Sequence, residues 1–165
     1  MDPQTIFAEL LSDYQCQPYA ELGVLLALHR AVANIHQTNH WQASGPLFYQ
    51  DHLLFERLYN TVNGVIDGLA EKAVGLGSPD LVRAQTQSQQ IDALIEYFCG
   101  SCSEPMLLSQ HVEDTCCALI HVSIENLKNT GMLTDGVDNL LQGLCDMHEN
   151  LRYLLKQRLA QPSVT

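Results

Sequence analysis

The sequence predicts an all-α protein, a bundle of four long helices with one long crossover connection. Four long segments carry apolar residues three and four positions apart, which is the period of an amphipathic helix. The second and third segments are separated by roughly 25 residues, whereas antiparallel neighbours in a bundle are usually joined by short loops. No segment shows the strict alternation of a strand, and no internal repeat or linker is visible. We therefore expect a single domain over residues 1–165.

The expected helices follow from the apolar stripes and from the residues that interrupt them. Gly-Pro or Gly-Ser-Pro sequences end the first two stripes, Pro105 is placed to open the third, and Thr134 is placed to cap the fourth. A short apolar-patterned piece after a glutamine-rich stretch predicts a small helix within the crossover. The expected ranges are Tyr19–Ala43, Tyr49–Leu76, Ile91–Phe98 for the small helix, Pro105–Asn129, and Thr134 to Leu159. Such an arrangement is typical of ferritin-like bundles.

Composition and charge exclude several classes of protein. Hydrophobic residues make up 46% of the chain, which argues against disorder. No apolar run reaches the roughly 20 residues of a membrane span. The N-terminal sequence lacks the basic and apolar regions of a signal peptide, so we expect a cytoplasmic protein. The formal net charge of −11 opposes nucleic-acid binding and favours metal cations, although an ordinary acidic surface would give the same value.

Five side chains that can bind metals form the main candidate site. Four of them lie within an arc of about 100° on the second helix, and one lies near the end of the first. Taken singly, each is typical of a solvated histidine or of surface charge. Together they form a nitrogen and oxygen ligand set that favours iron or zinc. The five are His40, His52, Glu56, Asp67 and Glu71.

The spacing of these residues indicates a site shared between two subunits. Asp67 and Glu71 follow His52 by 15 and 19 residues, which places them about 22–28 Å farther along a helix. One ion cannot reach both groups in one chain, but a two-fold dimer with antiparallel copies would join them and create two equivalent sites. The alternative is a dinuclear site inside one bundle, built from Glu-x-x-His pairs. The chain contains no Glu-x-x-His.

These segments resemble the signature of Dps-type miniferritins over most of the chain. The matching segments are His40-Trp41-Gln42-Ala43-Ser44-Gly45-Pro46-Leu47-Phe48, Asp51-His52, Glu56, Asp67-Gly68-Leu69-Ala70-Glu71-Lys72-Ala73 and, more weakly, Asp146-Met147-His148-Glu149. The resemblance implies a hollow dodecamer that oxidises Fe²⁺ with H₂O₂ or O₂ and stores ferric mineral. It also implies that one subunit supplies His40, His52 and Glu56 and that another supplies Asp67 and Glu71.

Further implications concern Trp41, zinc and DNA. Trp41 would lie beside the iron and intercept radicals, although an interface aromatic is an equal alternative. Zinc is a possible competitor for the same ligands.

The sequence departs from the family pattern at Gln42, where asparagine is commoner, and at Glu56, where aspartate is frequent. It also lacks a lysine-rich N-terminal tail, since the first basic residue is Arg30. We therefore expect weak or no DNA binding.

Several other residues keep two interpretations. His29 and His36 share the stripe of His40 and are either extra metal ligands or satisfied core or interface histidines, the second being favoured. Asp135 and Asp138 are candidates for an iron-entry pore and are equally typical of a helix N-terminus.

The six cysteines are expected to be reduced, with Cys116 and Cys117 in the core. The pair Cys99 and Cys102 forms an isolated C-x-x-C, for which His111 is a possible third zinc ligand.

Three functions remain open from the sequence. The leading one is a ferroxidase and iron store. The second is a nucleoid protein that compacts DNA, which a basic tail would support. The third is an assembly module that has kept the fold and lost catalysis, which the intact ligand set opposes.

Overall fold

The computed structural model describes residues 2–160, and its regular secondary structure in this range is entirely helical. The elements are α1 (Pro3–Ser12), α2 (Ala20–Gln42), α3 (Phe48–Leu76), a 3₁₀ helix η1 (Pro79–Val82), α4 (Ala84–Ser101), α5 (Pro105–Asn129) and α6 (Asp135–Leu159). The predicted all-α class is confirmed. Among these residues, no helix is long and apolar enough to cross a membrane.

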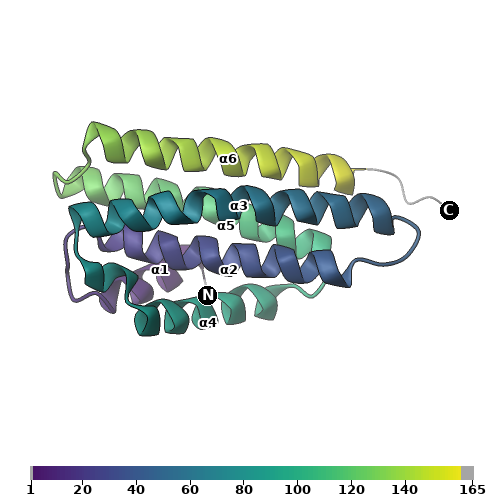
Figure 1. Ribbon diagram of the computed structural model, residues 1–165, viewed down its shortest axis with the longest axis horizontal. Coiled ribbons are helices and arrows are strands. Elements are labelled where there is room, and N and C mark those ends of the chain that lie inside the picture. The colour runs from purple at the N-terminus through teal and green to yellow at the C-terminus, as the bar shows by residue number, and fades with distance from the viewer. Residues whose placement is uncertain (1, 161–165) are drawn as a thin grey trace.

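Helices α2, α3, α5 and α6 lie along one common axis and form the bundle, and α4 runs beside α2 on its outer side (Figure 1). The bounds of these four helices agree with the predicted ranges to within a residue or two. The predicted local signals are also present. Pro105 opens α5, and Thr134 accepts a hydrogen bond from the backbone N–H of Val137 as the N-cap of α6. Gly45 and Gly131 have positive φ angles of 84° and 72° where the preceding helices end.

The crossover differs from its predicted form. Its helix α4 starts at Ala84 rather than at Ile91, because the glutamine-rich stretch is helical and partly buried. Gln87 donates to the carbonyl of Gly23 at 2.9 Å, and Gln90 donates to the carbonyl of Leu10 at 3.0 Å. Buried side-chain amides that donate hydrogen bonds to backbone carbonyls stabilise this helix. Because these buried residues are polar, the segment lacks the apolar periodicity from which a helix is predicted.

Helix α1, in contrast, was not predicted. Asp2 caps it by accepting from the backbone N–H groups of Gln4 and Thr5. Its apolar face is short, with Ile6, Phe7 and Leu10 buried against the bundle. Three buried residues over ten positions are too few for a clear helical period.

Candidate metal centre

His40 and His52 face one another where α2 turns into α3. A connection of five residues, 43–47, joins the two helices, so the last turn of α2 lies against the first turns of α3. The Nδ1 atom of His40 lies 2.9 Å from the carbonyl oxygen of His52, and Nδ1 of His52 lies 3.0 Å from the carbonyl oxygen of His40. The two rings stack with their centroids 3.7 Å apart.

This reciprocal bonding fixes the tautomer of both histidines. A carbonyl oxygen can only accept, so each Nδ1 carries the hydrogen, and the Nε2 atom of each neutral ring keeps its lone pair. Metal-ligating histidines are oriented in this manner, with one nitrogen bonded to a backbone carbonyl and the other directed at the ion. Both side chains are half-exposed. The chain therefore presents two neighbouring imidazole donors that an ion can reach.

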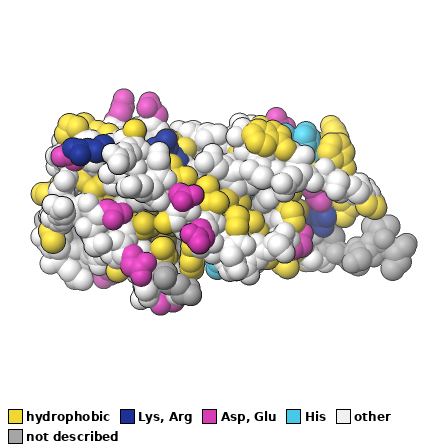
Figure 2. All heavy atoms as spheres, turned by 90° about the horizontal axis from the view of Figure 1, so that it is seen from below, with side chains coloured by type: hydrophobic (Ala, Val, Ile, Leu, Met, Phe, Trp, Pro, Cys, Tyr) yellow, Lys and Arg dark blue, Asp and Glu magenta, His cyan; other side chains and the backbone are white. Residues whose placement is uncertain are grey.

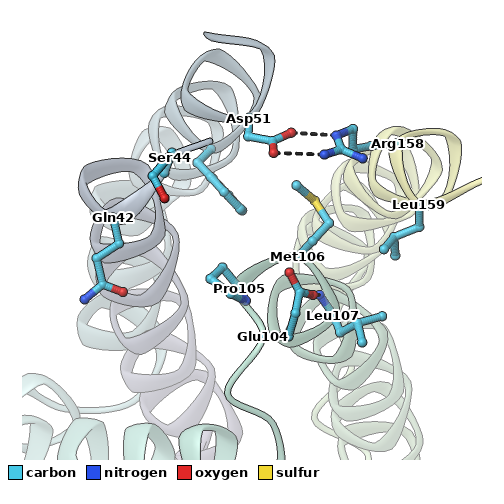
Figure 3. A pocket seen from close by; sticks show the side chains of 11 residues that line it. Gln42, Ser44, Asp51, Glu104, Pro105, Met106, Leu107, Arg158 and Leu159 are labelled. Atoms are coloured by element: carbon cyan, nitrogen blue, oxygen red, sulfur yellow. Dashed lines mark hydrogen bonds and ion pairs between the residues drawn. The ribbon is translucent and has the colours of Figure 1, made fainter. Parts of the chain in front are cut away.

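Glu56 and Asp51 extend this end of α3. Glu56 lies one helical turn after His52 on the same face and is half-buried. Asp51, the neighbour of His52, accepts two hydrogen bonds from Arg158 of α6, at 2.6 and 2.9 Å (Figure 3). The hydrogen bond to Asp51 raises the pKa of Arg158. This bidentate pair fixes the first turn of α3 to the last turn of α6.

The other two predicted ligands do not join this group. Asp67 and Glu71 lie in the second half of α3, and both are exposed. Since α3 is a single uninterrupted helix from Phe48 to Leu76, they stay about 22–28 Å from His52 along its axis. Within residues 2–160, no group of three His, Cys, Asp or Glu side chains is placed to hold a metal ion in one chain.

Exposed apolar side chains lie around the histidine pair and again at the far end of α3. The fraction of Trp41 exposed is 69%, and Figure 2 shows hydrophobic side chains on both sides of a histidine at one end of the molecule. Of eight exposed large hydrophobic residues among those described, six lie on α2 or α3, namely Trp41, Phe48, Tyr49, Leu53, Val74 and Leu76. Apolar side chains exposed on one pair of helices are typical of a protein–protein contact surface.

A buried polar network occupies the centre of the bundle. It joins α2, α5 and α6 through side chains that are all fully buried: His29, His36, Glu113 and His148. Glu113 lies 2.6 Å from Nε2 of His36 and 2.6 Å from Nδ1 of His148, and Nε2 of His148 lies 3.1 Å from Nε2 of His29. The interpretation of His29 and His36 as satisfied core histidines is confirmed.

The hydrogen-bond acceptors in this network indicate where its hydrogens lie. His29 Nδ1 donates to the carbonyl of Leu25 at 2.6 Å, so a neutral His29 accepts at Nε2 from His148. Burial, followed by the proximity of His148, lowers the pKa of His29 to about 3. Burial opposes ionisation of Glu113, but His148 and His36 outweigh it and lower its pKa to about 2. His148 thus lies between two acceptors, the carboxylate of Glu113 at Nδ1 and Nε2 of His29 at Nε2.

Sequence reasoning did not identify Glu113 and His148 as partners of these histidines. The signal available was Glu113 itself, a carboxylate that lies between Val112 and Cys116 in a strongly apolar helix. A charged residue at such a position is rarely buried without a partner. The sequence did not indicate which residues pair with Glu113, because its partners His148 and His36 are 35 and 77 positions away along the chain.

The remaining candidates have ordinary surroundings. Cys116 and Cys117 are buried, as predicted, and all six cysteines are free thiols. The ring of His111 packs against those of Phe98 and Tyr97, with centroids 5.9 and 6.2 Å away. Asp135 and Asp138 lie in the first turn of α6, where the helix dipole favours acidic side chains.

Comparisons with known proteins agree with this fold. The DNA protection during starvation protein of Brevibacillus brevis is 32% identical over 98 residues, which span 55% of this chain and 64% of that protein, less than two thirds of its length. The X-ray structure of Dps from Thermosynechococcus elongatus superposes with a TM-score of 0.70 at 20% identity, covering 99% of both chains. DpsC from Streptomyces coelicolor gives 0.66 at 18% identity, covering 88% of this chain and 84% of the other. No known family profile matches the chain.

Proposed function

We propose that this chain, which has the fold of Dps-type miniferritins, oxidises Fe²⁺ at sites shared by two subunits and stores the ferric product within a hollow dodecamer in the cytoplasm. The observation that carries the proposal is the His40–His52 pair. Its two Nδ1 atoms are held by backbone carbonyls, which leaves two adjacent Nε2 donors for an ion. The N-terminal half of α3 thus provides one part of a ligand set.

The second part comes from the opposite half of α3 in a partner subunit. When two copies pack with α2 and α3 antiparallel about a two-fold axis, the histidine end of one α3 meets the carboxylate end of the other. His40, His52 and Glu56 then face Asp67 and Glu71 of the partner subunit. The exposed apolar side chains on α2 and α3 support this contact, because burying them gives the dimer its hydrophobic contribution.

Iron is the substrate of this site, and the reaction is balanced without further cofactors. Two Fe²⁺ ions supply the two electrons that, with two protons from the solvent, reduce one H₂O₂ to two molecules of water, and the carboxylates stabilise the two Fe³⁺ ions formed. Oxidation in this manner removes both reactants of hydroxyl-radical formation, which would protect the cell against oxidative damage. O₂ is the alternative oxidant. Trp41, next to His40 in the chain, would intercept radicals, and Zn²⁺, which has no redox chemistry, would compete for the ligands.

A rate measurement tests the proposal. Fe²⁺ is added to the protein without oxygen, H₂O₂ follows, and Fe³⁺ formation is recorded by absorbance. The chain should oxidise Fe²⁺ faster than the uncatalysed reaction, and His52→Ala should remove this acceleration. His111→Ala, which changes a histidine packed on Tyr97 and Phe98, should retain it. Equal rates with and without protein would refute the ferroxidase and favour an assembly module that lacks catalysis.

The assembly is tested separately by light scattering or mass photometry. Twelve copies are expected, since the family resemblance implies a dodecamer and the ligand set is incomplete in one chain. A stable monomer at micromolar concentration would contradict both the cage and the shared site.

A further inference from the structure

A groove between α5 and α6 holds a second group of metal-binding side chains. The Sγ atom of Cys145 lies 3.6 Å from Nε2 of His121 and 3.9 Å from Oε1 of Glu149. These three residues line an open pocket together with Ile124, Gln142 and Asp146. None of them belongs to the His40–His52 site or to the buried network of Glu113.

The two helices present their donors at matching intervals. Cys145 and Glu149 are four residues apart on α6, so they share one face of that helix. Cys117 and His121 have the same spacing on α5. Since α5 and α6 are neighbours joined by residues 130–134, the two faces meet along the groove.

We propose that His121, Cys145 and Glu149 form a binding site for a divalent metal ion of the zinc class, with water as the fourth ligand. In a tetrahedral zinc site with Zn–S of about 2.3 Å and Zn–N of about 2.05 Å, sulfur and nitrogen are about 3.6 Å apart. The observed sulfur-to-nitrogen distance of 3.6 Å equals this value, whereas the sulfur-to-oxygen distance of 3.9 Å is longer, so the carboxylate of Glu149 has to move toward the ion. A sulfur, a nitrogen and a carboxylate donor together favour zinc over magnesium or calcium.

The site closes by side-chain rotation. As they stand, the described side chains do not converge on one point. Cys145 is buried and fixed, whereas His121 and Glu149 are exposed, so both can turn their donor atoms toward the sulfur without disturbing the core. Long exposed side chains change rotamer on a timescale of picoseconds to nanoseconds, so this closure presents no barrier to binding.

The charges of the closed site also balance. Burial raises the pKa of Cys145 to about 11, so the empty site holds a thiol. A bound ion displaces this proton to water, because coordinating thiols are deprotonated outright. One thiolate and one carboxylate then neutralise a divalent ion, and His121 adds a neutral donor. The bound ion would link α5 to α6 and stabilise the folded chain by mass action.

Cobalt is the probe that tests this site. Co²⁺ bound by a thiolate gives an intense near-ultraviolet charge-transfer band, which nitrogen and oxygen ligands do not give. The reduced wild-type protein should develop this band on titration with Co²⁺ and lose it on addition of Zn²⁺. Cys145→Ser should abolish the band. The exposed substitutions His121→Gln and Glu149→Gln, which leave the core intact, should each weaken Co²⁺ binding at least about tenfold.

The double variant Cys99→Ser/Cys102→Ser is the matched control, because it removes the other cysteine pair able to bind the metal. It should retain the band at full intensity. A wild-type protein without the band at saturating Co²⁺, a band that survives Cys145→Ser, or a band lost with Cys99 and Cys102 would each overturn the assignment. None of these results depends on Fe²⁺ oxidation, so the test is independent of the proposed ferroxidase.

Discussion

Arg158 binds Asp51 through two parallel hydrogen bonds of 2.6 and 2.9 Å, and Asp51 directly precedes His52 in the chain. The last turn of α6 thereby fixes the turn of α3 that carries a proposed iron ligand (Figure 3). Both side chains are largely buried, with 21% of Arg158 and 16% of Asp51 exposed. Solvent therefore screens this pair less than a surface ion pair.

Removal of Arg158 should destabilise the protein and loosen the site. In Arg158→Gln, Asp51 keeps its charge in a partly buried position without its partner, which should cost about 1–3 kcal/mol of unfolding free energy. The midpoint of urea unfolding at fixed protein concentration measures this change. Arg83→Gln breaks the exposed pair of Arg83 with Asp80 and should cost less than about 0.5 kcal/mol. Equal costs for the two variants would show that the bidentate pair stabilises nothing.

The buried histidine His29 should make stability depend on pH well above the range where carboxylates titrate. Its pKa in the folded protein is about 3, against an ordinary value of 6.5. Between these pH values His29 binds a proton in the unfolded chain but not in the folded chain. The free energy of unfolding therefore falls as the pH falls through this window. Glu113, whose pKa falls from 4.5 to about 2, contributes stability that is lost only at lower pH.

The difference between wild type and His29→Gln in unfolding midpoints measured between about pH 7 and pH 5 gives the contribution of His29, which has a limiting slope of about 1.4 kcal/mol per pH unit. His29→Gln keeps an acceptor for His148 and removes the titrating group, so the slope should decrease. His111→Gln should keep the wild-type slope. A His29→Gln protein that loses stability on acidification as steeply as wild type would show that His29 is not the group responsible.

The exposed histidine pair and the buried histidine network differ in how far they could be predicted from the sequence. His40 and His52 are 12 residues apart around one turn, so their contact depends on local structure alone. The pairing of His29 with His148 spans 119 positions and depends on how α2 and α6 are rotated in the bundle. The same limit applies to Gln87 and Gln90, whose backbone acceptors lie on α2 and α1. Periodicity describes one helix at a time and does not specify which faces meet.

Duplex DNA should bind weakly at physiological salt. The net charge of −11 repels phosphates. A gel shift at low-micromolar protein in about 0.15 M salt, without divalent metal, should show free DNA. Retarded DNA under these conditions would support a nucleoid protein instead. Binding that appears only with divalent metal and disappears with chelator would reflect bridging ions.

The shared construction of the iron site can be tested by complementation. If His52 and Asp67 serve one ion from different chains, His52→Ala and Asp67→Ala should each abolish fast Fe²⁺ oxidation. A His52→Ala chain still supplies Asp67 and Glu71, and an Asp67→Ala chain still supplies His40, His52 and Glu56. A mixed dimer therefore contains one complete site and one site that lacks both residues.

Dissociating and reassembling the two variants together should restore part of the activity. With random pairing half of the dimers are mixed, so about one quarter of the wild-type sites should return, as the isologous geometry of a two-fold interface requires. Each variant reassembled alone is the control and should stay inactive. A site within one subunit predicts no recovery, because every chain then carries its own lesion. Mixtures shown by mass spectrometry to contain mixed dimers, yet still inactive, would refute the inter-subunit site and leave the bundle fold unaffected.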